Sequence, residues 1–181
     1  DEVREMLRTL DEIARRLKKR TKESIDTDRR LVKKLREETD KSIEDDKKLV
    51  KEVEELLDGG ADEKIVREVI KRSRDLNREN KERSRKVIKE SRELNKRNSE
   101  ETKRVIEELR ELLRKLKDDG VEERKLRELE KRIRKAEEEL RRDNERSKKE
   151  TEDVERDLER KNEESERRTR EAEKRLKERS D

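Results

Sequence analysis

Hydrophobic side chains return at intervals of three and four residues along nearly the whole chain, the spacing that puts them on one face of an α-helix. The pattern stops at two short segments, 58–62 and 117–121, which hold all three glycines of the sequence. The helical pattern therefore falls into three stretches of nearly equal length. We predict helices at about residues 1–58, 61–118 and 121–181. At 1.5 Å per residue, each helix would be roughly 85 Å long.

The two interruptions are typical of tight turns between helices. A glycine just after a helix can adopt the left-handed conformation that ends it. Asp62 and Asp119 are placed to accept hydrogen bonds from the free N–H groups of the helix that follows. Connections this short make successive helices antiparallel. The sequence therefore predicts an all-α fold: an up-down-up antiparallel three-helix bundle of long, nearly straight helices, with residues 1–181 forming a single domain.

Each predicted helix repeats its own pattern with the same fixed period. The repeating segments are 21–35 with 39–53, 69–80 with 87–98, and 144–158 with 162–176, so the period is eighteen residues. Eighteen residues over five turns gives 3.6 residues per turn, the value of an unstrained α-helix. A seven-residue or eleven-residue repeat would impose a supercoil, so this period predicts helices that are almost untwisted.

The hydrophobic stripes are narrow, covering roughly 80° of arc on the third predicted helix and roughly 120° on the first two, at about 100° per residue. Arcs of this width suit a helix that touches two neighbours. Disorder is the other state that such a charged composition permits, but a disordered chain needs no stripe. The periodicity therefore favours a bundle.

Polar residues replace hydrophobic ones at fixed places within the stripes. Thr21 stands one period after Val3, and Asn144 stands one period after Leu126. Counting residues outward from each turn brings the polar sets of the three helices to matching heights, so we expect two buried polar layers about 27 Å apart. An unpartnered buried polar group costs about 1–3 kcal/mol, so the members should hydrogen-bond to one another and fix helix pairing and register. The first layer comprises Thr21, Ser24, Asp28, Ser91, Asn95, Asn98, Asn144, Ser147 and Thr151, and the second comprises Thr39, Ser42, Asp46, Ser73, Asn77, Asn80, Asn162, Ser165 and Thr169.

Hydrophobic layers are expected between and beyond the polar ones. The layer between them contains Leu31, Val32, Leu35, Val87, Ile88, Val154 and Leu158. The first turn is closed by Val53, Leu57, Ile65, Val66 and Leu176. The layer near the second turn contains Val3, Leu7, Leu10, Ile13, Leu17, Val105, Ile106, Leu109, Leu112, Leu113, Leu126, Leu129 and Ile133.

Composition narrows the possible partners. Charged residues make up 63% of the chain and hydrophobic ones 23%, and Phe, Tyr, Trp, Cys, His and Pro are all absent. The net charge of +4 comes from 59 basic and 55 acidic residues whose signs are interspersed along the chain. We find no basic block to bind phosphates and no aromatic side chain to stack on a base, so we expect no nucleic-acid partner. No hydrophobic run approaches the length of a membrane span, so we expect no membrane partner either.

Candidate catalytic chemistry is sparse. Without His, Cys or Tyr, acid–base and nucleophilic groups reduce to carboxylates, Lys, Ser and Thr, and these form no recognisable arrangement. Asp28 and Asp46 give each polar layer one carboxylate, and one carboxylate is too few for a metal site. We therefore predict no catalytic residue, no cofactor, no metal and no small-molecule substrate.

The combination of a long repeat inside each helix, alternating polar and hydrophobic layers, Asp-Gly turns and Glu/Lys/Arg exteriors resembles de novo designed helical bundles with buried hydrogen-bond networks. The resemblance covers essentially the whole chain. It implies a synthetic scaffold of high stability, with no substrate and no natural cellular compartment, expected to stay soluble when expressed in the cytoplasm.

Two interpretations of function remain open within that resemblance. The chain can be a structural scaffold that is complete by itself. It can instead be a helix-binding or self-associating module, such as one chain of a designed heterodimer or homo-oligomer, whose partner is another copy or a designed helix. A natural coiled-coil spacer and an enzyme are weaker alternatives.

Overall fold

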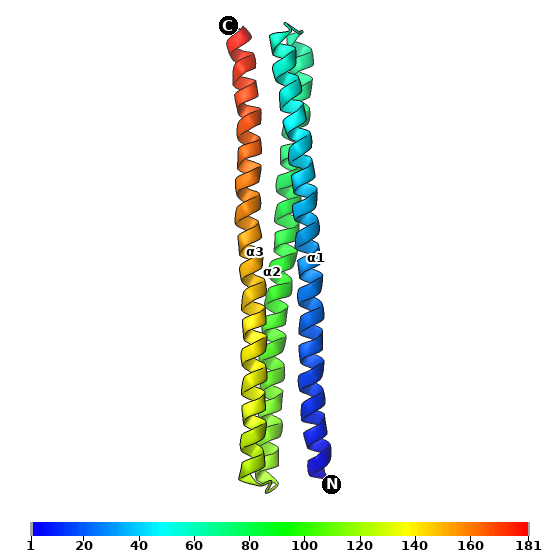
Figure 1. Ribbon diagram of the computed structural model, residues 1–181, viewed down its shortest axis with the longest axis vertical. Helices are drawn as coiled ribbons and strands as arrows, with labels where there is room; N and C mark the ends of the chain where they lie inside the picture. Colours follow the sequence, from blue (N-terminus) through cyan, green and yellow to red (C-terminus); the bar gives the residue numbers. More distant parts are fainter. Residues whose placement is uncertain (1, 181) are drawn as a thin grey trace. The chain divides into compact units, whose positions relative to one another are not determined.

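The computed structural model describes residues 2–180, and these form an all-α bundle of three long helices (Figure 1). Helix α1 spans Glu2–Asp58, α2 spans Glu63–Asp118 and α3 spans Glu123–Ser180. The predicted fold class, and the number and order of the helices, are confirmed. The predicted end points at residues 1 and 181 lie outside the described residues.

Helices α2 and α3 begin two residues later than predicted. The carbonyl of Asp62 accepts the first N–H groups of α2, so Asp62 precedes the helix. The carbonyl of Glu122 does the same for α3. The prediction that Asp119 would play this part is wrong, because Asp119 lies in the turn and its N–H donates back to the Lys115 carbonyl at 2.9 Å.

Each turn depends on one glycine in the left-handed conformation, Gly60 with φ of 69° and Gly120 with φ of 82°. After Gly60, the N–H of Ala61 donates to the carbonyl of Leu56 at 2.9 Å, which closes the end of α1. The second turn repeats this pattern. Any other residue at either position would have to adopt a backbone conformation that L residues avoid.

The chain divides into two compact units, and every helix contributes to both. Unit 1 contains the chain up to residue 30 together with residues 91–150. Unit 2 contains residues 31–90 and the chain from residue 151 onward. All three pairs of helices are in contact.

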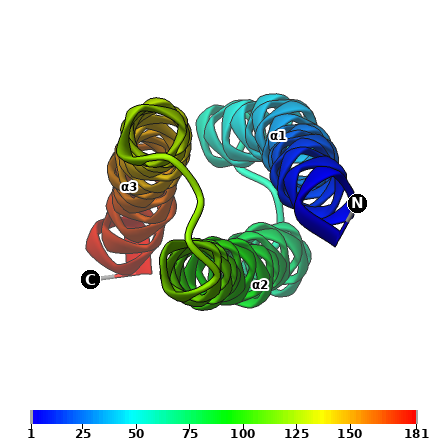
Figure 2. The ribbon, with the colours of Figure 1, turned by 90° about the horizontal axis from the view of Figure 1, so that it is seen from below.

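Unit 1 has a hydrophobic core near the turn between α2 and α3, which is the near end in Figure 2, where the three helices surround a common centre. Every hydrophobic residue predicted near this turn belongs to the core or packs against it. Its buried members are Leu10, Leu17, Val105, Ile106, Leu109, Leu116, Leu126, Leu129, Ile133 and Leu140.

Unit 2 has two hydrophobic clusters. One, near the turn between α1 and α2, contains Val50, Val53, Leu57, Val66, Val69, Ile70, Ala172 and Leu176. The other contains Leu35, Ile88, Val154 and Leu158. The predicted cluster near the turn wrongly included Ile65, which is 52% exposed. Leu31 is only half-buried. One residue of helix rotates a side chain by about 100°, so Ile65 lies well away from the face that Val66 turns inward.

Candidate functional site

The residues of the two predicted polar layers are buried, with one exception. Ser24 is half-buried. From helical geometry it points about 60° away from Thr21 and about 40° away from Asp28, toward the edge of the interior face. The buried members are Thr21, Asp28, Ser91, Asn95, Asn98, Asn144, Ser147 and Thr151 of the first set and Thr39, Ser42, Asp46, Ser73, Asn77, Asn80, Asn162, Ser165 and Thr169 of the second.

In unit 2 a carboxyl group from α1 is held by hydroxyl groups from the other two helices. Asp46 is completely buried. Ser73 of α2 donates to Asp46 Oδ1 through a short hydrogen bond. Ser165 of α3 lies 2.6 Å from Asp46 Oδ2. Each carboxyl oxygen therefore has its own hydroxyl partner, one from each neighbouring helix.

The same side chains close into a ring. Ser165 Oγ lies 2.7 Å from Asn77 Oδ1, and Asn77 Nδ2 donates to Thr169 Oγ1 at 2.8 Å. Thr169 Oγ1 lies 2.7 Å from Ser73 Oγ, which returns the chain of contacts to Asp46. We call these five residues, Asp46, Ser73, Asn77, Ser165 and Thr169, the Asp46 network. It joins all three helices at one level of unit 2.

Four of the five residues one period away lie in unit 1 and make an equivalent but looser set, the Asp28 network: Asp28, Ser91, Asn95 and Ser147. Ser147 Oγ lies 2.9 Å from Asn95 Oδ1 and 3.2 Å from Asp28 Oδ2. Ser91 also hydrogen-bonds to Asp28. Asp28 Oδ1, although buried, has no hydrogen-bond partner. The Asp28 carboxyl is therefore less completely satisfied than that of Asp46.

Burial raises the pKa of Asp28 above its ordinary value, because desolvation disfavours the charged carboxylate. The hydrogen bonds from Ser91 and Ser147 oppose this shift, and so does the charge of Arg29 to a smaller extent. The negative charge of Glu150 adds to the shift. Desolvation is the largest of these effects, so the net result is a pKa above the ordinary aspartate value.

Beside each network lies a smaller polar pair that links α3 to α2. Asn144 Nδ2 donates to Thr102 Oγ1 at 3.1 Å, and Thr102 Oγ1 donates to the Asn98 carbonyl at 2.8 Å. In unit 2, Asn162 Nδ2 donates to Ser84 Oγ at 3.4 Å. Thr102 and Ser84 were missed at the sequence level. They lie one period apart and each follows a layer asparagine by four residues, so the repeat could have revealed them.

Several buried polar atoms remain unpaired, and they fall largely at equivalent places in the two repeats. Each such atom costs about 1–3 kcal/mol. Besides Asp28 Oδ1, the layer atoms of this kind are Thr39 Oγ1, Asn80 Nδ2, Asn98 Nδ2, Asn144 Oδ1 and Asn162 Oδ1. The polar layers therefore carry a cost in stability that an all-hydrophobic interior would avoid.

Ion pairs tie the helices together on the surface. Arg29 of α1 binds Glu150 of α3 at 3.1 and 3.2 Å, and Lys161 of α3 binds Asp40 of α1 at 2.9 Å. The hydrogen bond to Asp40 is the main reason that the pKa of Lys161 is raised. Such exposed pairs are worth only about 0–1 kcal/mol each, so they add little to the stability of the fold.

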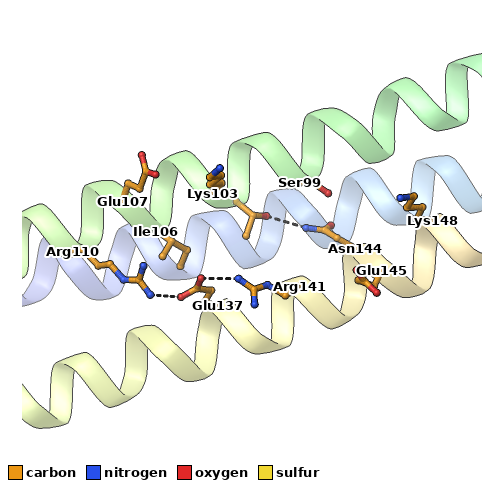
Figure 3. Close-up of a pocket in the computed structure, with 11 residues that line it drawn as sticks. Ser99, Lys103, Ile106, Glu107, Arg110, Glu137, Arg141, Asn144, Glu145 and Lys148 are labelled. Atoms are coloured by element: carbon orange, nitrogen blue, oxygen red, sulfur yellow. Dashed lines mark hydrogen bonds and ion pairs between the residues drawn. The ribbon is translucent and has the colours of Figure 1, made fainter.

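The cleft in Figure 3 lies in unit 1 between α2 and α3 and has a volume of about 440 Å³. Seven of its eleven lining residues are charged, and one of the acidic ones pairs with two arginines. Glu137 binds Arg110 at 2.5 Å and Arg141 at 3.2 Å. Ile106, at the floor, is 2% exposed. The cleft is therefore lined by charges of both signs, four basic and three acidic.

The described part of the chain shows no group of three or more acidic side chains arranged to hold a metal ion. Over residues 2–180, none of the helices is long and hydrophobic enough to cross a membrane. The buried ionisable residues in this range are Asp28 and Asp46, and each belongs to a separate network.

No protein-family model matches the sequence, and a search of curated proteins finds no relative. Among solved structures, the chain is similar to a computationally designed three helix bundle, with a TM-score of 0.64 and 20% sequence identity over 97% of this chain and 92% of the other. At that identity the likeness concerns the fold. By its architecture, this chain is a three-helix bundle with a hydrogen-bonded polar interior.

Proposed function

We propose that the chain is a de novo designed structural scaffold without natural biochemical activity, in which the buried polar networks fix helix pairing and register. The observation that carries the proposal is the Asp46 network, which joins one carboxyl from α1 to hydroxyl and amide groups of α2 and α3. A hydrogen-bonded set of this kind fits only when all three helices are in one register, because a shifted helix would leave its partners unpaired.

The repeat and the fold likeness support the designed origin. The same set of residue types recurs one period later in every helix, and the composition uses few residue types. The solved structure of similar fold is itself described as computationally designed. A repeat that keeps 3.6 residues per turn is the simplest way to repeat a layer without making the helices supercoil around one another.

The register role can be tested by replacing the nine members of the Asp46 and Asp28 networks with Leu, Ile or Val. We expect the variant to resist denaturant better than the wild type, since the desolvation cost is removed. We also expect it to lose a single structure, with several masses by light scattering or multiple amide signals by NMR. One monomeric species with the wild-type pattern of amide signals would contradict the register role.

A self-associating module is the second candidate, and one observation favours it. Hydrophobic side chains of α1 and α2 in unit 1, namely Met6, Leu7, Ile13, Leu112 and Leu113, pack against the core but stay only half-buried. A second copy of the chain could cover them. Light scattering across a wide concentration range separates the two functions: a constant monomer mass supports the scaffold, and a dimer mass supports association.

A further inference from the structure

We propose that unit 1 contains a proton-binding site in its interior: Asp28 is buried as the neutral acid and donates a hydrogen bond from Oδ2 to Ser147. Folding would therefore strengthen the binding of a proton at this carboxyl. The site links the stability of the bundle to pH, and this role is separate from the register role of the networks.

The first argument is the surroundings of the two carboxyl oxygens. Asp28 is 2% exposed, and its Oδ1 is buried without a hydrogen-bond partner. A carboxylate carries negative charge on both oxygens and needs donors at both. In a protonated carboxyl the hydroxyl group has the strongest requirement for a hydrogen-bond partner. Leaving its carbonyl oxygen without a partner costs much less free energy than leaving a carboxylate oxygen without one.

The second argument is the count of hydrogens at Ser147. Its hydroxyl oxygen lies between two oxygens, 2.9 Å from Asn95 Oδ1 and 3.2 Å from Asp28 Oδ2. A serine hydroxyl has one hydrogen to donate. If that hydrogen serves the nearer acceptor, Asn95, then the contact with Asp28 is satisfied only when the carboxyl supplies the hydrogen.

The third argument is that the compensating positive charge around Asp28, among the described residues, is weak. From its own helix the charged neighbour is Arg29, whose guanidinium is engaged by Glu150 of α3. Glu150 itself is negative and disfavours a second negative charge nearby. Helix α2 faces Asp28 with Ser91, which does not titrate. The raised pKa of Asp28 agrees with these surroundings.

The proposal fixes the sign of the pH dependence. The pKa of Asp28 is raised on folding, so its contribution to stability is complete below the ordinary Asp value of about 3.9 and is lost as the pH rises through the raised value. An Asp28→Asn variant should imitate the protonated form, since an amide nitrogen can donate to Ser147. Asp45→Asn, which removes an exposed carboxylate on α1, corrects for the change in net charge.

The test compares denaturant midpoints of the wild type, Asp28→Asn and Asp45→Asn from pH 4 to pH 8, and follows the side-chain carboxyl carbon of Asp28 by NMR in the wild type. We expect Asp28→Asn to have the higher midpoint at pH 7, with the difference shrinking toward pH 4, and no such trend for Asp45→Asn. The Asp28 carbon should titrate above the ordinary value.

A titration at or below that value, or an Asp28→Asn variant less stable than the wild type at pH 7, would overturn the proposal. If the variant does not fold, the NMR titration of the wild type decides alone.

Discussion

The Asp46 and Asp28 networks are built from the same residue types at positions one period apart, yet they are not equally complete. The serine from α3 lies 2.6 Å from the carboxyl oxygen of Asp46 and 3.2 Å from that of Asp28. Both oxygens of Asp46 have hydroxyl partners, whereas one oxygen of Asp28 has none. A repeated sequence therefore repeats the placement of a polar layer but not the quality of its hydrogen bonds. Side-chain placement within a layer decides whether a buried carboxyl is fully satisfied.

The largest expected effect comes from removing the two carboxyls separately. Asp46→Ala loses two hydrogen bonds and strands two buried hydroxyls, so we expect it to lower the free energy of unfolding at pH 7 by about 3 kcal/mol. Asp28→Ala removes a poorly satisfied carboxyl and should cost about 1 kcal/mol or less. Denaturant unfolding followed by circular dichroism measures both. Equal losses would show that the two networks do not differ in the way their contacts indicate.

The turn glycines should behave alike, in contrast to the two carboxyls. Gly60 and Gly120 both have positive φ, and a side chain added at either would meet no atom within 4 Å. Gly60→Ala and Gly120→Ala should therefore each cost about 1 kcal/mol from backbone strain alone. Denaturant midpoints of the two variants measure this cost. A loss at one turn several times that at the other would mean that something other than backbone conformation limits the turns.

Two asparagines with an unpaired amide oxygen extend the comparison to substitutions that should stabilise the fold. Asn144 and Asn162 are equivalent in the repeat, and each has a buried oxygen without a partner. Asn144→Leu and Asn162→Leu should each raise the free energy of unfolding by about 1 kcal/mol, because the unpaired oxygen is removed and hydrophobic area is buried. If denaturant unfolding instead showed either variant to be destabilised, its amide oxygen would have to be satisfied in solution.

The smallest effect concerns Glu150, whose charge helps to raise the pKa of Asp28. Glu150→Gln removes that charge and also frees Arg29, and both changes favour the carboxylate. We expect the NMR titration of Asp28 to move to lower pH, with little change in stability, as is usual for exposed pairs. Glu145→Gln, at an exposed site on the same helix, is the matched control. An upward or absent shift in Glu150→Gln would contradict the charges assigned around Asp28.

Much of the fold could be predicted from the sequence, because it depends on the periodic spacing of hydrophobic residues and on the residues that interrupt it. The spacing of hydrophobic residues indicated the helices, and Gly60 and Gly120 marked the turns. Three of the errors came from side-chain direction near the edge of a stripe. Ser24, Leu31 and Ile65 each lie beside a correctly placed residue but turn outward far enough to meet solvent.

The membership of the candidate site was also visible in the repeat, but its bonding was not. Matching heights along the helices place Asp46, Ser73 and Thr169 near one level, and helix geometry alone is enough for that. The choice of which hydroxyl serves which acceptor depends on helix separation and rotamers, which no residue pattern records. The bare Oδ1 of Asp28 belongs to this second kind of information.

The central claim is that the polar residues of the three helices are bonded to one another in the interior, and a double-mutant cycle between Asp46 and Ser165 tests it most directly. These residues lie on α1 and α3, 2.6 Å apart at their nearest oxygens. We predict a coupling energy of about 1–3 kcal/mol for the Asp46→Ala and Ser165→Ala pair. The exposed neighbour, in the pair Asp45→Ala and Ser165→Ala, should show none. A coupling near zero for Asp46 and Ser165 would contradict the buried network.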